Sequence, residues 1–187
     1  SVFERHQHYE RLLAQYQKVL YLCVGSVFTG NYQVATDWKK KHDRQNRFTV
    51  IDTGAASGRL AAAVIATVKY SARAKTPHQV IEFAEKAVEK SGEYIFLDEL
   101  KYLAAGGRMS KTGAFFGDIL HMKPVVTPTS RGAEKVGIVR NTRAQLDFAV
   151  KRLTKDLRDK PYPLVLLEYT DNRKWVEDRA LTEIRRI

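Results

Sequence analysis

Two short apolar runs, each followed by a turn of small residues and a helical pattern, most constrain what this chain can fold into. Residues 19–24 form the first run, and residues 48–51 form the second. Runs of this length are too short for buried helices and are typical of strands covered on both faces, as in a parallel sheet. The alternation of strand and helix predicts an α/β fold, with a mostly parallel open sheet and helices on both of its faces.

Helical spacing of apolar residues predicts helices around these runs. The first helix is expected from Tyr9, the second over about 32–42, and an Ala/Val-rich helix runs to about Arg73. Thr76 and Pro77 then open a further helix, through a capping box with proline at the first helical position. The order of strands and helices is that of an open α/β sheet.

Both turns after the apolar runs contain residues that suit an anion. The first turn comprises residues 25–31 and the second comprises residues 52–58. Small residues at the carboxyl end of a strand allow free backbone N–H groups to face a ligand. Phosphate and carboxylate both fit, although such residues also serve ordinary turns. The candidate residues are Gly25, Ser26, Thr29, Gly30, Asn31, Ser57 and Gly58.

The pattern changes beyond Gly92, where we expect a domain boundary. Residues 1–92 are expected to form an N-terminal α/β domain that lacks its first strand. Residues 93–187 are expected to form a second α/β domain that is incomplete at its end. A sheet without its first strand has an open edge, through which two copies of the chain could pair as a dimer.

The second half is expected to contain antiparallel strands. Residues 123–128 and 133–139 read as two strands joined by a short turn, which predicts a hairpin. Thr142 is expected to cap a long helix, residues 164–169 to form a buried strand, and residues 173–186 to form a final helix.

An arginine follows a pair of glycines in the same half. Residues 97–110 read as a short amphipathic helix that ends at Gly106 and Gly107 and is followed at once by Arg108. Two glycines permit positive φ and close approach, so the arginine is held on a tight turn where it could bind an anion. A helix C-cap with a solvent-facing arginine explains the pattern equally well.

The net charge of +11 is the one unusual feature of the composition. The excess is spread evenly over both halves, and we expect no nucleic-acid partner. The densest basic cluster lies at the end of a predicted helix, where cations interact favourably with the helix dipole; docking of an acidic surface is the alternative. This cluster consists of Lys39, Lys40, Lys41 and Arg44.

Several classes of function are not supported by the residues. The histidines lack metal-ligand spacing, and the chain contains no nucleophile elbow, dinucleotide fingerprint or Walker phosphate loop. A single cysteine, Cys23, cannot form an internal disulfide. No membrane span or secretory signal is predicted, which makes the cytoplasm the expected location. By elimination, we expect a binding protein without a metal or cofactor rather than an enzyme.

Three motifs resemble the DegV family of bacterial fatty-acid-binding proteins. Residues 24–33 are similar to the family's Ser-Ser-x-Leu-Ser-Gly-Thr-Tyr-Gln loop, and residues 50–58 are similar to its Val-x-Asp-Ser turn. Residues 100–110 and the pair Lys123 and Pro124 resemble its Leu-x-Tyr-Leu-x-x-Gly-Gly-Arg-x-Ser and Lys-Pro motifs. The family's first segment and its final His-x-Gly-Pro-Gly segment have no counterpart, so the chain resembles the middle part of a family member.

The resemblance implies a two-domain α/β protein that holds one long-chain fatty acid in a slot. Thr29 stands where the family's loop serine binds the carboxylate, with Ser26, Gly30 and Asn31 around it. Arg108 matches the arginine at the mouth of the site. The turns that line the site would be those of Gly25, Ser57, Gly58, Gly106 and Gly107.

The resemblance also implies a partner. In the family, the protein presents the fatty-acid carboxylate to a separate fatty acid kinase subunit, which forms an acyl phosphate. The chain itself would then be a lipid-binding subunit without catalysis. The alternative is an enzyme that acts on a small phosphorylated substrate held by the same Ser, Thr and Gly turns.

Overall fold

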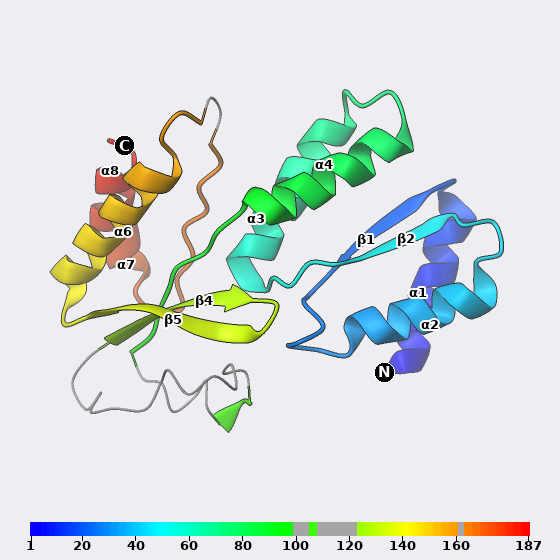
Figure 1. Cartoon of the computed structure of the whole chain (residues 1–187), viewed down its shortest axis with the longest axis horizontal. Helices are drawn as coiled ribbons and strands as arrows, with labels where there is room; N and C mark the ends of the chain where they lie inside the picture. Colours follow the sequence, from blue (N-terminus) through cyan, green and yellow to red (C-terminus); the bar gives the residue numbers. More distant parts are fainter. Residues whose placement is uncertain (99–104, 108–122, 161–162) are drawn as a thin grey trace. The chain divides into compact units, whose positions relative to one another are not determined.

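The structure is a computed structural model that describes residues 1–98, 105–107, 123–160 and 163–187 (Figure 1). Contacts divide the chain into two compact units. Unit 1 comprises Ser1–Ser91 and Pro128–Gly132, and unit 2 comprises Gly92–Thr127 and Ala133–Ile187. Unit 1 contains a parallel pair of strands and unit 2 an antiparallel sheet, so the predicted α/β class is confirmed. The expectation of two incomplete domains stays a prediction.

The parallel pair of unit 1 consists of β1 (Val19–Cys23) and β2 (Phe48–Asp52). They are joined by α2 (Asn31–His42), which supplies the crossover that parallel strands require. In the register, Val19 lies opposite Phe48 and Cys23 opposite Asp52. The prediction that these strands are covered on both faces is wrong for most of their residues, which are half-buried. Each strand has one partner in the described part of the chain, so the outer edge of each strand is unpaired there.

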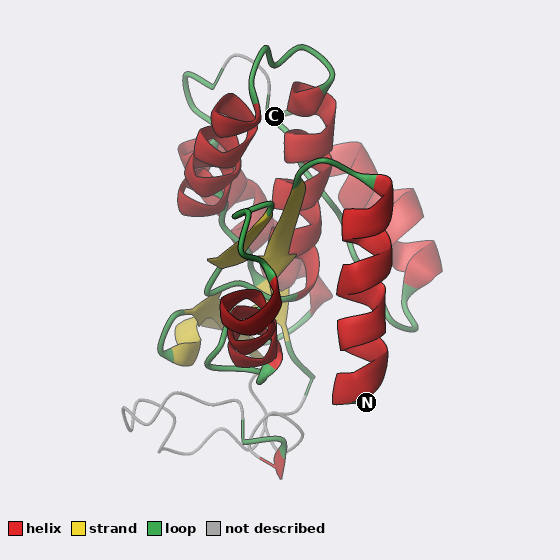
Figure 2. Cartoon of the chain, turned by 90° about the vertical axis from the view of Figure 1, so that its right-hand side faces the viewer, coloured by secondary structure: helices red, strands yellow, loops and turns green. Residues whose placement is uncertain are grey.

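An aromatic cluster forms the core on one face of this pair. The first helix, α1 (Val2–Gln15), begins at the end marked N in Figure 2. Tyr9 from α1 and Trp38 from α2 pack on Phe48 of β2. The centroid of the Tyr9 ring lies 5.0 Å from that of Phe48 and 5.4 Å from that of Trp38, in tilted and edge-on geometries. Such pairs add to the large apolar area that aromatic rings bury. The cluster therefore anchors both helices to the sheet.

Arg47 joins the end of α1 to the start of β2. Its guanidinium donates to the backbone oxygens of Leu13, Tyr16 and Gln17, the last at 3.0 Å, and so satisfies carbonyls at the carboxyl end of the helix. Asp43 in turn accepts hydrogen bonds from the backbone N–H groups of Arg47 and Phe48, at 2.9 and 2.7 Å. These bonds fix the entry of the chain into β2.

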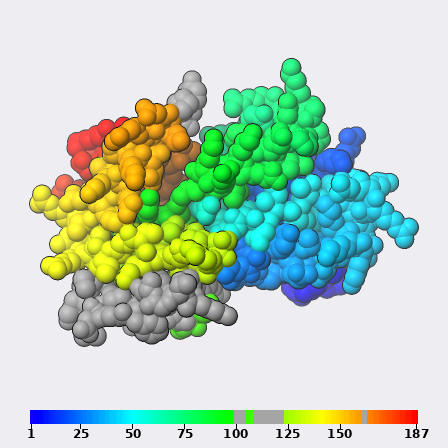
Figure 3. All heavy atoms as spheres, in the orientation of Figure 1, coloured from blue at the N-terminus to red at the C-terminus, as the bar shows by residue number. Residues whose placement is uncertain are grey.

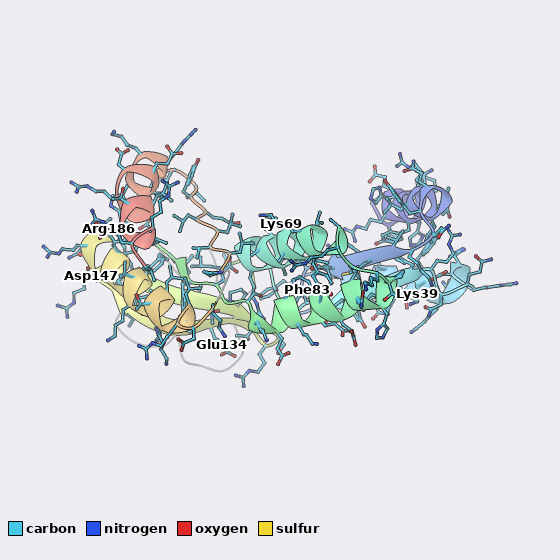
Figure 4. All side chains as sticks on the ribbon, turned by 90° about the horizontal axis from the view of Figure 1, so that it is seen from above. Lys39, Lys69, Phe83, Glu134, Asp147 and Arg186 are labelled. Atoms are coloured by element: carbon cyan, nitrogen blue, oxygen red, sulfur yellow. The ribbon has the colours of Figure 1, made fainter. Side chains whose placement is uncertain are left out.

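A helical hairpin completes unit 1, formed by α3 (Ser57–Ser71) and α4 (Pro77–Lys90). The rings of Tyr70 and Phe83 stack at 4.2 Å between the two helices (Phe83 is labelled in Figure 4). The capping box at Thr76 is confirmed, since its hydroxyl accepts from the N–H of Gln79 at 3.3 Å and the Gln79 side chain accepts from the N–H of Thr76.

The sheet of unit 2 has the order β3 (Ile95–Phe96), β4 (Lys123–Thr129), β5 (Gly132–Val139). β3 and β4 are antiparallel. β4 and β5 are neighbours joined by two residues, a connection that only antiparallel strands allow, so the predicted hairpin is confirmed.

The helix α6 (Thr142–Asp156) follows this sheet. Its cap is Asn141, whose side chain accepts from the N–H of Ala144 at 2.9 Å. The prediction that Thr142 caps the helix is wrong by one residue, because Asn is at least as good an acceptor for this N–H. Phe148 of α6 meets the ring of Phe96 edge-on at 5.9 Å, which packs the helix against the sheet.

The last part of the chain departs from the prediction at one segment. Residues 164–169 form no strand, and Leu164, Leu166 and Tyr169 are 43%, 40% and 41% exposed. Within the described residues this segment pairs with no strand, so the prediction of a buried strand is wrong. The predicted final helix is confirmed as α7 (Arg173–Trp175), a π-helical turn η1 (Val176–Ala180) and α8 (Leu181–Ile184).

The predicted helical segment 97–110 falls largely outside the described residues. Among the helices that the structure describes, none combines the length and the apolar character that crossing a membrane demands.

Burial of the aromatic core makes a prediction for alkaline stability. Burial raises the pKa of the Cys23 thiol to about 11, from an ordinary value of 9.0, and that of Tyr21 to about 12, from 10.0. The unfolded chain therefore loses these protons at lower pH than the folded chain. Urea titrations should show a free energy of unfolding that is highest below pH 9 and falls by about 1–2 kcal/mol between pH 9 and pH 11.

The variant Cys23→Ala is the control for this prediction. It removes the thiol, so its free energy of unfolding should fall less steeply over the same range, with the contribution of Tyr21 remaining above pH 10. Equal slopes in the variant and the parent chain would contradict the assignment to Cys23.

Candidate functional site

The two turns predicted to bind an anion meet at the carboxyl ends of β1 and β2. The N–H of Gly25 donates to the backbone oxygen of Ala55 at 2.8 Å. A Cβ atom on Gly25 would lie 2.8 Å from the Cα of Gly54, closer than real Cβ atoms approach backbone. Gly54 itself has a φ of +58°, in the left-handed region that favours glycine. Glycine at both positions is thus what brings the turns together.

Thr53 connects the end of β1 to the second turn. Its side chain is buried, and its hydroxyl donates to the backbone oxygen of Cys23 at 2.6 Å and accepts from the N–H of Ala55 at 3.1 Å. One hydroxyl therefore satisfies backbone groups at the ends of both strands, which would otherwise be buried without partners. Thr53 lies in the predicted second turn, but its bridging of the two strand ends was not predicted.

Asp52 is a charged residue of the junction that the site prediction omitted. Its exposed carboxylate accepts from the N–H of Ser26 at 2.9 Å and from the N–H of Gly54 at 3.3 Å. It therefore bridges the first turn and the second turn. It also places a negative charge beside the predicted anion site, so a bound anion needs several donors or a cation to balance it.

Among the predicted residues, Thr29 has a hydroxyl that can still donate a hydrogen bond to a ligand. Its hydroxyl oxygen accepts from the N–H of Asn31 at 3.3 Å, while the hydroxyl proton remains available for a further acceptor. The side chains of Ser26 and Asn31 make no hydrogen bond to other described residues. Gly30 precedes α2 as its N-cap and supplies no side-chain cap. The side chains of the first turn thus offer two hydroxyls and an amide.

The backbone of the first turn does not behave as predicted. The N–H groups of most of its residues already donate within the protein, so they do not face a ligand as free donors. The engaged N–H groups are those of Gly25, Ser26, Phe28, Thr29 and Asn31. The turn folds onto itself and onto Asp52, which leaves side chains as its main donors.

The second turn leads directly into α3. Ser57 is exposed and has a φ of +39°, unusual for a residue with a side chain, and Gly58 is half-buried beside it. Arg59 follows, and its guanidinium donates to Val88 O at 2.9 Å, to Ser91 Oγ at 3.2 Å and to Pro128 O at 3.2 Å. Arg59 was not predicted as a site residue, because its partners are distant in sequence.

The described site residues predicted in the second half, Gly106 and Gly107, belong to unit 2. Gly107 is exposed with a φ of +64°, and Gly106 is half-buried, as a tight turn requires. Both lie in unit 2, whereas the other predicted residues lie in unit 1. Arg108 lies outside the described residues, so its role stays a prediction.

A separate cavity of about 430 Å³ lies between α1 and β1. None of the predicted site residues lines it. Its walls include Arg5, His8, Tyr9, Leu12 and Tyr21. Elsewhere in the part of the chain that the structure describes, no three His, Cys, Asp or Glu side chains are grouped so as to hold a metal ion.

The chain is similar to known proteins of one family. A model of the DegV family, described as an uncharacterised protein family, matches residues 1–184. A DegV domain-containing protein of Lactococcus lactis, YteA, is 27% identical over 158 residues, which are 82% of this chain and 54% of that protein. The chain therefore spans about half the length of this curated relative.

Solved structures show the same fold. A structure of a DegV family protein from Thermus thermophilus, described as showing fatty acid binding, matches with a TM-score of 0.74 at 23% identity, over 85% of this chain and 56% of that one. A stearic acid-binding protein from Eubacterium ventriosum matches with a TM-score of 0.74 at 20% identity, over 86% and 56%.

The junction of the two turns makes a prediction for stability. Gly25→Ala should lower the free energy of unfolding by about 1–3 kcal/mol, because the added methyl group forces Gly54 away. Gly30→Ala is the matched control, since a Cβ atom there meets nothing within 4 Å and the backbone φ is −79°. Urea denaturation of both variants measures the difference. Equal losses would show that the close approach of the turns is not required.

Proposed function

The chain belongs to the DegV family, and we propose that it binds one long-chain fatty acid, with the carboxylate held at the first turn. The observation that carries this proposal is the Thr29 hydroxyl, whose oxygen is occupied by the N–H of Asn31 and whose proton is available. Ser26, Gly30 and Asn31 complete the head-group site. Relatives of known structure that are described as fatty-acid-binding support the choice of ligand.

The negative charge of Asp52 favours a head group that carries a single negative charge. Asp52 lies at the junction and repels any anion there, so a carboxylate with one negative charge is favoured over a phosphate monoester with nearly two. Hydroxyl and amide donors suit a carboxylate in such surroundings. This argues against the alternative of an enzyme that acts on a small phosphorylated substrate.

Arg108 is proposed as the cation that balances these charges at the mouth of the site, on a turn formed by Gly106 and Gly107. The turns of Gly25, Ser57 and Gly58 line the same site. The acyl chain would lie in a slot between the two domains. Each buried methylene adds about 0.8 kcal/mol of binding free energy, so a long chain contributes most of the affinity.

The family resemblance supports a proposal for what the protein does with its bound fatty acid. We propose that the chain acts in the bacterial cytoplasm as a lipid-binding subunit without catalysis or cofactor, and that it presents the carboxylate to a separate fatty acid kinase subunit. The kinase would then form the acyl phosphate. A dimer through the open edge of the sheet is a further part of this proposal.

Substitution of Thr29 tests the head-group assignment. Thr29→Val should weaken binding of palmitate by about five- to twentyfold, because a hydrogen bond to a charged group is lost. Thr29→Ser should retain most of the affinity, since it keeps the hydroxyl. Isothermal titration with palmitate measures the dissociation constants.

Thr36→Val serves as the matched control on the helix that follows the turn. The Thr36 hydroxyl donates to backbone oxygens of α2 and is not part of the proposed site. Its removal should leave palmitate binding within twofold of the parent chain. If Thr29→Val and Thr36→Val bind palmitate equally well, Thr29 does not hold the carboxylate.

A further inference from the structure

The tip of the β4–β5 hairpin belongs to unit 1, although its two strands belong to unit 2. Contacts assign Pro128–Gly132 to the same compact unit as the two turns. A Cβ atom on Gly54 would lie 3.5 Å from both the Cα and the Cβ of Ser130, an ordinary van der Waals contact. In Figure 3 the yellow atoms of the hairpin tip adjoin the cyan atoms that follow β2. The tip therefore forms a further wall of the junction.

Arg59 ties this tip to the helices of unit 1. One arm of its guanidinium donates to Pro128 O at 3.2 Å, next to the hairpin turn, while the other donates to Val88 O at 2.9 Å and its Nε donates to Ser91 Oγ. A planar guanidinium fixes three acceptors at once, which a flexible lysine ammonium cannot reproduce. Arg59 thus links the start of α3, the end of α4 and the base of the turn.

The turn is also closed on itself by hydrogen bonds of the Thr129 hydroxyl. The hydroxyl of Thr129 accepts from the N–H of Arg131 at 3.1 Å and donates to Gly132 O at 2.9 Å, and Gly132 has a φ of +112°. Ser130 is exposed between them, and its hydroxyl has no partner among the residues that the structure describes. The hydroxyl is free to meet a ligand.

We propose that Ser130 is a further ligand-binding residue and that Arg59 is the positioning residue that holds it at the site. Ser130 lies beside Gly54, within 3.5 Å of where a Cβ atom there would be, and the N–H of Gly54 shares the Asp52 carboxylate with the N–H of Ser26. Its hydroxyl would donate to the head group from beside the second turn. The inference rests on the proposed function, since the head group is the fatty-acid carboxylate.

The test compares two ligands that differ only at the head group. Ser130→Ala should weaken binding of palmitate by about five- to tenfold and leave binding of hexadecanol within twofold, because the neutral alcohol gains less from the donor. Ser71→Ala is the matched control: Ser71 is an exposed serine of unit 1 whose hydroxyl donates to Val68 O. It should change neither dissociation constant.

A double-mutant cycle tests the role of Arg59. Arg59→Gln should weaken palmitate binding, and Ser130→Ala should add less than twofold to that loss, because the hairpin tip is no longer held at the site. Hydrogen exchange in the ligand-free chain should show faster exchange at residues 129–132 in Arg59→Gln, with Arg59→Lys giving only partial rescue. Independent, additive losses would overturn the positioning role.

The outcomes separate this inference from the function on which it rests. If the parent chain binds palmitate and Ser130→Ala matches Ser71→Ala, the role of Ser130 is overturned while fatty-acid binding stands. If the parent chain binds neither ligand, the proposed function fails and the inference fails with it. Because Ser130 is exposed, its substitution keeps the test valid even if Arg59→Gln does not fold.

Discussion

The close approach of two backbone turns at the ends of β1 and β2 is the constraint on which the rest of the site depends. Gly25 has no space for a side chain, and Gly54 adopts a conformation that side chains disfavour. Thr53 then joins the two strand ends through its buried hydroxyl. Once these three residues are set, the hydroxyls of the first turn and the start of α3 occupy fixed positions.

Charge at this junction decides which ligands fit. Asp52 organises both turns through two backbone N–H groups, but its carboxylate also repels anions. In the proposed site, this charge favours a singly charged head group that meets several neutral donors. A fatty-acid carboxylate meets these conditions, and its affinity would come chiefly from the buried chain.

Features that depend on local sequence were predictable. The strands β1 and β2, the helix α2 and the capping box at Thr76 follow from spacing and composition over a few residues, and the structure has them close to where they were expected. The motifs also led to the family, because they combine residues in a fixed order. Local patterns of this kind were sufficient for the fold class.

Features that depend on distant partners were not predictable. Residues 164–169 have the composition of a buried strand, but a strand needs a neighbour, and none pairs with them in the described chain. The roles of Asp52 and Arg59 arise from acceptors and donors that lie elsewhere in the sequence. Two engaged N–H groups of the first turn, those of Gly25 and Ser26, likewise donate to Ala55 and Asp52, which spacing does not reveal.

A crystal structure of the chain grown with palmitate tests the central claim most directly. We predict electron density for one acyl chain whose carboxylate oxygens lie within hydrogen-bond distance, about 2.5–3.0 Å, of the Thr29 hydroxyl. An acyl chain in the cavity lined by Tyr9, Leu12 and Tyr21, with no density at the first turn, would contradict the account.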